Sequence, residues 1–239
     1  MSDKKQEREL RLPLVMYHHL LEDEAGCGDY VISPRTLEGD LAYLRDHGYT
    51  AVGAGDVLRW LRGETELPDK PIMLTFDDGR DSFADRALPL LEKYGMKAVQ
   101  APVMAWAGNP DPDGSGYSCM SPGSIAEAAA SDLVELANHS FDMHLVRPRF
   151  GILRMEGESG ADYRAAFVSD TEKAEEALAA ACGYVPRVYA YPFGEFGPEA
   201  ESMLAGRGYR LAFTCAEQVN VIKRGAAGLT ELGRFNRAF

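Results

Sequence analysis

PIMLTFDDGRD, residues 71–81, joins a continuous apolar run directly to a cluster of charged residues. The run 71–76 predicts a buried strand, because a short apolar run bounded by turn-forming residues is typical of one. Asp77 and Asp78 would follow at the end of that strand, where Gly79 permits a turn. Two adjacent carboxylates raise the cost of ionising one another unless a cation lies between them or a turn separates them. Taken alone, either aspartate could equally cap the helix that follows.

Similar apolar runs alternate with segments of helical periodicity along the rest of the chain. Strands are expected at 12–17, 71–76, 97–103, 133–138, 187–193 and 209–214, with a weaker one at 49–52. Helices are expected from Ser33-Pro34 to about Gly48 and at about 54–63, 84–94, 122–131, 159–181 and 198–206. This order implies a mainly parallel sheet covered by helices, and about seven strand-helix units in about 225 residues suit a closed or nearly closed barrel. The chemistry of such folds lies at the carboxyl ends of the strands.

The composition limits the class of protein. The chain has 239 residues, 46% of them apolar, and its 25 basic and 37 acidic residues give a net charge of −12. That size suits one domain with a single core, which needs no disulfide framework. The four cysteines form no CxxC pair, which excludes zinc ribbons and thioredoxin-like redox motifs. An acidic chain without a Lys/Arg-rich run is a poor binder of phosphate backbones, so we expect no nucleic-acid partner.

Residues 1–11 are polar and charged, and we assign them to an N-terminal tail that precedes a single domain at 12–239. The tail lacks the apolar core of a signal peptide, and no later stretch approaches the roughly 18 continuous apolar residues of a membrane span. We therefore expect a soluble chain without a transmembrane segment. The widely spaced cysteines suit a reducing or an oxidising compartment equally well.

A second polar cluster, NHSFDMH at 138–144, follows the expected strand 133–138. His139 and His144 are too far apart to share one face of a helix as an i, i+4 pair would, so joint metal binding requires a strand end followed by a turn. Two imidazoles and one carboxylate from the aspartate pair would leave a coordination position open for water or substrate, as in catalytic metal sites. We expect a catalytic metal site at this end of the barrel.

Two further strand ends carry candidate residues. The run 189–194 (YAYPFG) ends a strand with proline and glycine, and by itself it predicts no more than a rigid turn after an edge strand. The first strand ends in His18 and His19. Successive side chains of a strand face opposite ways, so only one of these histidines can readily point into the barrel mouth.

Together these motifs resemble the polysaccharide deacetylase family, the NodB homology domain of carbohydrate esterase family four. TFDDG at 75–79, His-Ser…His at 139–144 and Tyr-Pro-Phe-Gly at 191–194 stand in the family's order, and the likeness covers nearly the whole chain from Leu12. The chain most resembles the subgroup that deacetylates poly-β-1,6-N-acetylglucosamine in biofilms. In that subgroup the first strand ends in Tyr-His, and the two metal histidines lie one residue farther apart than in the rest of the family. The resemblance implies a distorted (β/α)7 barrel, a single α/β domain that hydrolyses N-acetyl groups on a polysaccharide.

The resemblance also assigns a role to each residue of the two polar clusters. Asp77 is implied as the general base. Asp78, His139 and His144 are implied as ligands of a divalent metal, with Zn²⁺ as the first choice and Co²⁺, Ni²⁺ or Fe²⁺ as alternatives.

The remaining implied roles concern the leaving group and the substrate. His18 is implied as the acid that protonates the leaving amine, with the adjacent His19 as its rival. Residues implied at the substrate are Tyr191, Pro192 and Phe193 around the oxyanion, with the Phe193 N–H as donor, and Trp106 and Arg234 as candidate substrate contacts.

The chain departs from the common family pattern at two positions. Ala190 stands where the pattern has an arginine that orients the base, and no histidine follows His144. The biofilm subgroup takes its catalytic histidine from the first strand, which maps onto His18. Because of these departures, the chain could instead be an inactive protein that binds carbohydrate. If the chain is an enzyme, its alternative substrates are peptidoglycan N-acetylglucosamine and short chitin-like oligomers.

The implied partner is a polysaccharide of the biofilm or cell surface that contains N-acetylglucosamine, and we expect a monomer. Members of the family usually act outside the cytoplasm behind a leader, and we expect none in residues 1–11 of this chain. The resemblance therefore implies an extracytoplasmic location, secreted or at the cell surface, with a cytoplasmic one left open.

Overall fold

The apolar run 71–76 and the aspartate pair after it form the longest strand in the computed structural model of the chain, which describes residues 9–239. This strand, β6 (Pro71–Asp78), is buried along its whole length. It pairs in parallel with β2 (Leu14–Tyr17) on one side and with β7 (Ala98–Pro102) on the other. The short β5 (Thr50–Ala51) pairs with its first residues. β6 is therefore a central strand of a parallel sheet.

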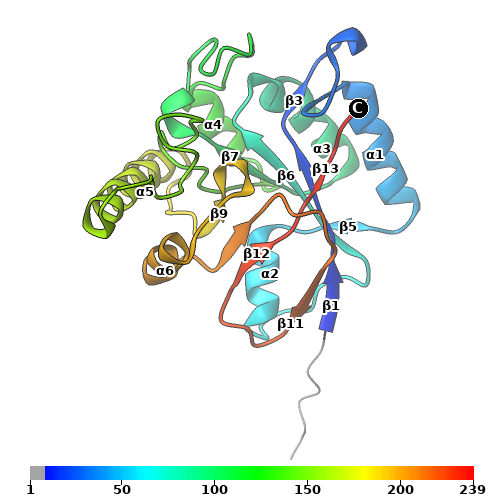
Figure 1. Cartoon of the computed structure of the whole chain (residues 1–239). Helices are drawn as coiled ribbons and strands as arrows, with labels where there is room; N and C mark the ends of the chain where they lie inside the picture. Colours follow the sequence, from blue (N-terminus) through cyan, green and yellow to red (C-terminus); the bar gives the residue numbers. More distant parts are fainter. Residues whose placement is uncertain (1–8) are drawn as a thin grey trace, which may run out of the picture.

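The sheet continues beyond β7 and returns to β2 (Figure 1). The strands that complete it are β8 (Val134–Leu136), β9 (Val188–Ala190), β10 (Leu211–Phe213), β12 (Leu229–Leu232) and β13 (Phe235–Asn236). β8 pairs with β7, a bridge between Asn138 and Tyr189 leads on to β9, and β9 pairs with β10. β12 pairs with β10 and β13 pairs with β2, both in parallel. The predicted α/β barrel is confirmed, and its closing strand is split in two at Gly233 and Arg234.

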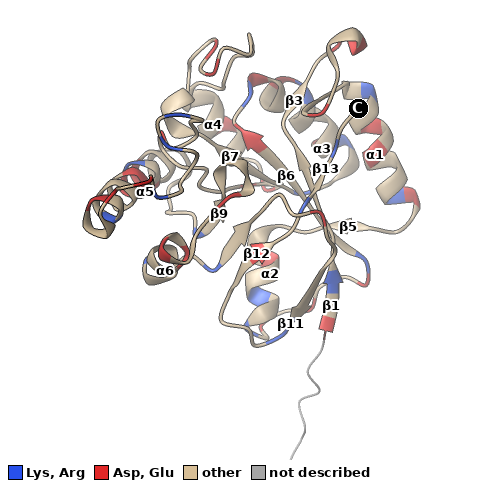
Figure 2. Ribbon diagram, viewed as in Figure 1, with Lys and Arg blue, Asp and Glu red and all other residues tan. Residues whose placement is uncertain are grey.

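Helices surround the barrel, and their ends follow the local sequence. They are α1 (Pro34–Asp46), α2 (Ala54–Leu61), α3 (Leu88–Tyr94), α4 (Pro122–Ala129), α5 (Gly160–Cys182) and α6 (Pro198–Gly206). Ser33 and Ser159 cap α1 and α5 by accepting a backbone N–H of the first turn at the side-chain oxygen. Each expected helix forms, although the one expected at 84–94 begins with a π-helical turn at Phe83–Ala87. Acidic and basic residues lie side by side on the outer helices, as Figure 2 shows for α1 and α5.

Alternate residues of β6 face two different cores. Ile72, Leu74 and Phe76 pack among side chains of α1, α3 and α4 in one apolar cluster. Met73 packs in a second cluster, with residues of the other strands and of α2, so its face of β6 points into the barrel. Side chains alternate along a strand, and Asp77 therefore shares the face of Met73. The carboxylate of Asp77 extends from the end of the barrel core.

The N-terminal strand β1 (Glu9–Leu12) begins inside the stretch expected as a polar tail, and it pairs antiparallel with β11 (Asn220–Lys223). Residues 1–8 of the expected tail lie outside the described residues. Two short strands, β3 (His19–Leu20) and β4 (Val31–Ile32), pair in parallel after the end of β2. Within the part of the chain that the structure describes, no helix has the length and apolar content needed to cross a membrane.

Candidate active site

A cavity of about 1010 Å³ opens among the carboxyl ends of the barrel strands. Residues of the strand ends singled out in the sequence line it, namely His18, His19, Asp77, Asp78, His139, His144, Tyr191 and Phe193. Other loops complete its wall with Asp29, Tyr30, Asp113, Tyr117, Cys215 and Glu217, among others. The fold thus brings residues far apart in the sequence to one place.

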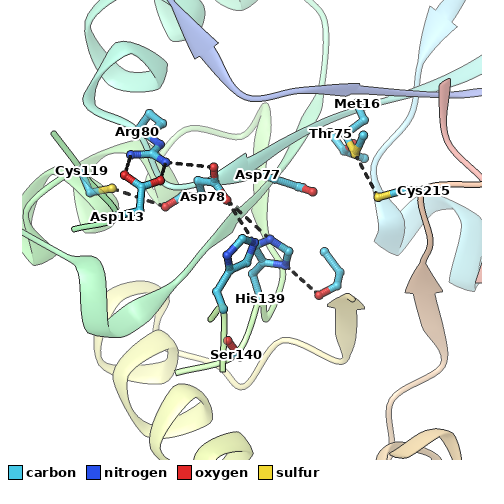
Figure 3. A network of polar contacts seen from close by, with 12 residues as sticks. Met16, Thr75, Asp77, Asp78, Arg80, Asp113, Cys119, His139, Ser140 and Cys215 are labelled. Atoms are coloured by element: carbon cyan, nitrogen blue, oxygen red, sulfur yellow. Dashed lines mark hydrogen bonds and ion pairs between the residues drawn. The ribbon is translucent and has the colours of Figure 1, made fainter. Parts of the chain in front are cut away.

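Asp78, His139 and His144 direct their ligand atoms at one another in this cavity, and Figure 3 shows Asp78 facing His139. Asp78 Oδ1 lies 3.7 Å from His139 Nε2 and 3.6 Å from His144 Nε2, and all three atoms lie within 4.8 Å of one another. Asp78 Oδ1 is buried and has no hydrogen-bond partner among residues 9–239. A buried carboxylate oxygen requires a partner, and one oxygen with two imidazole nitrogens is a ligand set that divalent metals take. The three residues fit a metal ion.

The backbone determines which nitrogen of His139 is free to bind. Nδ1 of this ring lies 2.8 Å from the carbonyl oxygen of Ala190, at the end of β9. A carbonyl oxygen only accepts, so Nδ1 carries the proton and donates it. The lone pair of Nε2 therefore faces Asp78, as a metal-binding histidine requires.

His144 is oriented by aromatic neighbours. Trp106 packs edge-on against its ring at 5.0 Å, and the ring of Phe193 lies 4.4 Å away. Burial, together with the neighbouring His139, lowers the pKa of His144 to about 4, so the imidazole is neutral at pH 7 and able to bind a metal. Trp106 is itself buried and does not line the cavity. Trp106 is therefore placed to orient His144, and not to contact substrate as expected from the sequence.

Each carboxylate of the aspartate pair has its own guanidinium. Arg234 donates from Nη1 to Asp77 Oδ1 at 2.8 Å, and its Nη2 lies 2.8 Å from Oδ2. Arg80 donates from Nη2 to Asp78 Oδ2 at 3.3 Å. Burial would raise the pKa of Asp77, but the charge and hydrogen bond of Arg234, together with the nearby His139 and His18, outweigh burial and hold that pKa far below its usual range. The two aspartates can therefore both be ionised although they are adjacent.

Arg234 was expected as a substrate contact, and the structure places it elsewhere. Its side chain is wholly buried, does not line the cavity, and lies between the two halves of the closing strand. There it makes the contact with Asp77 that the resemblance assigns to an arginine at the position of Ala190. A residue between β12 and β13 thus compensates for the departure at Ala190, and no spacing rule in the sequence links the two positions.

Backbone strain is concentrated at this site. Asp78, Ser140 and Phe193 are the non-glycine residues with positive φ in the described part of the chain, at 70°, 72° and 60°. Such conformations cost about 1–3 kcal/mol each and persist where the surrounding structure imposes them. At Asp78 the left-handed conformation begins the turn that was expected only at Gly79, which also has positive φ. The turn gives Asp77 and Asp78 separate surroundings.

His18 faces the aspartate pair. It lines the cavity, and its ring packs edge-on against Tyr30 at 4.9 Å. Its Nδ1 is buried without a hydrogen-bond partner among the residues that the structure describes. Burial lowers the pKa of His18, while the charges of Asp78 and Asp77 act in the opposite direction. His18 therefore has a free ring nitrogen beside the candidate metal ligands.

His19 has different surroundings, as the alternation of side chains along a strand requires. Its Nδ1 lies 2.9 Å from Ser82 Oγ, and its ring stacks on Tyr117 at 4.1 Å. Burial and the charges of Arg80 and Arg86 lower the pKa of His19 to about 4. A histidine with this pKa is almost entirely neutral at pH 7, and the contact with Ser82 occupies one of its two ring nitrogens.

The Tyr-Pro-Phe-Gly motif forms a short 3-10 turn at the cavity wall. The Phe193 N–H donates no hydrogen bond to any of residues 9–239, so it remains available to a ligand. The Phe193 ring stacks on Phe150 at 4.6 Å. Tyr191 lines the cavity and stacks on Phe196 at 4.4 Å, while Pro192 is buried behind them. The motif therefore offers one backbone donor at the site.

A carboxylate on α5 holds the turn that separates His139 from His144. Asp170 accepts the Phe141 N–H at 2.9 Å and the Asp142 N–H at 2.7 Å. The preceding amide, of Ser140, donates to Asn138 Oδ1 at 2.8 Å. Successive amides of an irregular turn are thus satisfied by side chains, which fixes the path between the two histidines. Nothing in the sequence marks Asp170 for this task, since it lies inside a regular helix.

Asp170→Asn is expected to destabilise the protein by about 1–3 kcal/mol, the cost of a buried amide without a partner. The two amides donate to different oxygens of the carboxylate, and asparagine has an NH₂ donor in place of one of them, so one amide would face another donor. Urea unfolding would measure the change. Asp142→Asn alters an exposed carboxyl in the same turn and should leave stability unchanged. Equal stability of the Asp170 variant and the unchanged protein would contradict the role given to Asp170.

Two solved structures share this fold. The de-N-acetylase from Aggregatibacter actinomycetemcomitans superposes with a TM-score of 0.82 at 24% identity, covering 95% of each chain. The structure of IcaB from Ammonifex degensii superposes with a TM-score of 0.79 at 28% identity, covering 94% of this chain and 90% of that one.

Sequence comparison gives the family. Poly-β-1,6-N-acetyl-D-glucosamine N-deacetylase of Escherichia coli K12 is 30% identical over an alignment of 221 positions that covers 82% of this chain. The chain spans only 33% of the length of that relative. The family model described as polysaccharide deacetylase matches residues 64–212, more than half of the chain. These residues include the aspartate pair, the two histidines and the Tyr-Pro-Phe-Gly motif, and the chain belongs to the polysaccharide deacetylase family.

Proposed function

We propose that this protein is a metal-dependent N-deacetylase that removes N-acetyl groups from N-acetylglucosamine units of a polysaccharide. The observation that carries the proposal is a buried, ionised Asp77 beside a separate group of three metal-ligand residues. Hydrolysis of an amide by activated water requires both parts, since the group that takes the proton of the water cannot at the same time be a ligand.

The metal would be held by Asp78, His139 and His144. Bound there, it would polarise the acetyl carbonyl and lower the pKa of a water molecule. We propose Zn²⁺, because histidine and carboxylate ligands with one position left open are typical of catalytic zinc. Co²⁺, Ni²⁺ and Fe²⁺ bind similar ligand sets.

Asp77 takes a proton from the attacking water as the water oxygen bonds to the acetyl carbon. Arg234 keeps Asp77 ionised and holds both of its oxygens. A guanidinium also makes a carboxylate a weaker base, so Arg234 contributes by positioning the Asp77 carboxylate and not by raising its basicity. The Phe193 N–H donates to the oxygen that gains negative charge, as oxyanion donors do.

His18 supplies the proton that the departing nitrogen needs. An amine leaves poorly until it is protonated, and the carbon–nitrogen bond breaks as the proton arrives. The products are acetate and a free amine on the sugar. Burial lowers the pKa of both histidines, but the largest charge effects on His18 come from Asp78 and Asp77, which favour a protonated ring, whereas the largest on His19 come from Arg80 and Arg86, which oppose one.

His18→Ala is therefore expected to lower the turnover number by about 10²–10⁴-fold, the usual contribution of one acid–base group. His19→Ala loses a ring stacked on Tyr117 and a contact with Ser82, and it should retain most of the turnover. Steady-state kinetics of the two variants at saturating zinc gives the comparison. Inactivity of the His19 variant alone would transfer the acid role to His19.

We propose poly-β-1,6-N-acetylglucosamine as the substrate, as the name of the Escherichia coli relative suggests. The charge of the cavity supports this choice over peptidoglycan. Carboxylates of Asp29 and Glu217 lie on its wall, whereas the cationic side chain there, Arg80, is already ion-paired with Asp113. Peptidoglycan carries acidic groups that such a wall repels, and poly-N-acetylglucosamine is neutral or, once deacetylated, cationic. Such a polymer lies in the biofilm or at the cell surface, so we propose that the enzyme acts outside the cytoplasm. We also propose that it acts as a monomer.

Acetate release from poly-β-1,6-N-acetylglucosamine oligomers, with zinc added and with a chelator, tests the proposal. Release that depends on zinc and exceeds the release from chitin oligomers and from peptidoglycan is the expected result. Metal content should be measured on the same sample. A protein that binds zinc but releases no acetate from any of the three glycans would be a carbohydrate-binding protein, and the proposed activity would be wrong.

A further inference from the structure

A buried arginine connects the candidate metal ligand Asp78 to a loop of the cavity wall. Arg80, 4% exposed, donates to Asp78 Oδ2 and also to Asp113, where Nη2 lies 2.5 Å from Oδ2 and Nη1 lies 3.3 Å from Oδ1 (Figure 3). Its Nη1 donates in addition to the carbonyl oxygen of Tyr117 at 3.1 Å. One planar guanidinium thus spans two carboxylates from segments far apart in the sequence.

Asp113 belongs to the loop between Trp106 and α4, and this loop is built around it. The N–H and Oγ–H of Ser115 donate to Asp113 Oδ1 at 3.3 and 2.6 Å. Asp113, Ser115 and Tyr117 line the cavity. Arg80 also forms an antiparallel bridge with Cys119 at the end of the loop. The conformation of the loop and the position of the Arg80 guanidinium are therefore linked.

Charge explains why Arg80 needs Asp113. A guanidinium that holds Asp78 Oδ2 leaves Oδ1 directed at the two histidines, which favours a bound cation. The same positive charge repels that cation, and the repulsion is large in a buried site because the local dielectric constant is low. The carboxylate of Asp113 neutralises Arg80 on the side away from Asp78. The pair as a whole positions Asp78 without adding net charge.

We infer that Arg80 and Asp113 act together as positioning residues for the metal site, and that the loop around Asp113 controls metal affinity through them. The inference rests on the proposed function only in giving Asp78 the role of a metal ligand. Neither residue needs to touch substrate for this effect.

Competition with a chromophoric zinc chelator, in the absence of glycan, tests the inference. Asp113→Asn leaves an unneutralised guanidinium at Asp78, and it is expected to weaken zinc binding by about 10–100-fold, the usual effect of losing a partner of a metal ligand. Asp111→Asn is the matched control. Asp111 lies in the same loop and accepts the Gly116 N–H, so its variant loses the same charge without affecting Arg80, and zinc affinity should change less than about threefold.

Arg80→Lys tests the same link from the other side. Lysine keeps the charge but cannot hold two carboxylates with one planar group, so zinc affinity should fall here as well. Asp113→Glu keeps the charge and should restore most of the affinity. Thermal unfolding of each variant is recorded first, and if Asp113→Asn does not fold, Arg80→Lys decides the question.

Unchanged zinc affinity in a folded Asp113→Asn or Arg80→Lys variant would overturn the inference. So would an equal loss in the Asp113 and Asp111 variants, since that would be a general effect of loop charge. The proposed function fails differently: an unchanged protein that binds zinc yet releases no acetate refutes the activity and leaves the affinity comparison valid. An unchanged protein that binds no zinc refutes both.

Discussion

Asp77→Asn is expected to lower acetate release by about 10²–10⁴-fold while zinc remains bound. An amide cannot take a proton from the attacking water, and Asp77 is not one of the three residues whose ligand atoms converge. The loss should therefore appear in the turnover number, with the zinc content of the purified protein unchanged. Steady-state kinetics and elemental analysis on one preparation would measure both.

Asp78→Asn and His139→Ala provide the contrast. Each removes one of three ligands, so both variants should lose zinc as well as activity. If instead the Asp77 variant lost the metal and the Asp78 variant kept it, the two aspartate roles would be reversed. Retained activity in the Asp77 variant would remove Asp77 from the mechanism altogether.

Arg234→Met is expected to destabilise the protein by about 3–5 kcal/mol, because it leaves the Asp77 carboxylate buried without its partner. Both members of this pair are almost wholly inaccessible, at 0% and 3% side-chain exposure. Urea unfolding followed by circular dichroism would give the free energy of unfolding. Activity should fall too, since the base loses both contacts that orient it.

The neighbouring Arg237 offers a matched control for Arg234. It pairs with Asp40 through two hydrogen bonds, but at a partly exposed position. Pairs of that kind contribute about 0–1 kcal/mol, so Arg237→Met should change stability little. Comparable losses in both variants would show that removal of any arginine from this end of the chain is destabilising, and the specific role of Arg234 would not stand.

Much of the fold could be predicted from local signals. The run 71–76 is apolar except for Thr75 because it is buried on both faces. Serines such as Ser33 and Ser159 mark helix starts because their side chains satisfy free backbone amides. Polar clusters directly after such runs predicted where Asp78, His139 and His144 would gather. Those signals act over a few residues, which is why they can be read without the structure.

Other features depend on contacts between distant segments. The halves of the closing strand, β12 and β13, are short and pair with different neighbours, so no periodic pattern marks them. Arg234 was interpreted as a candidate substrate contact because the sequence does not show which residue an arginine will pair with. Asp170, Arg80 and Asp113 were not singled out for the same reason. Each acts through a hydrogen bond to a segment that only the fold brings near.

The split closing strand sets an order of events during synthesis. Asp77 precedes its partner Arg234 by 157 positions. At about 5–20 residues per second, the ribosome therefore makes Asp77 roughly 8–30 s before Arg234. Until the last strand emerges, the first barrel strand, β2, lacks the neighbour that covers its free edge, and Asp77 has no counter-charge. Co-translational folding of the preceding strands can thus yield only an open sheet, and closure of the barrel and formation of the Asp77–Arg234 ion pair occur together, once β13 has left the ribosome.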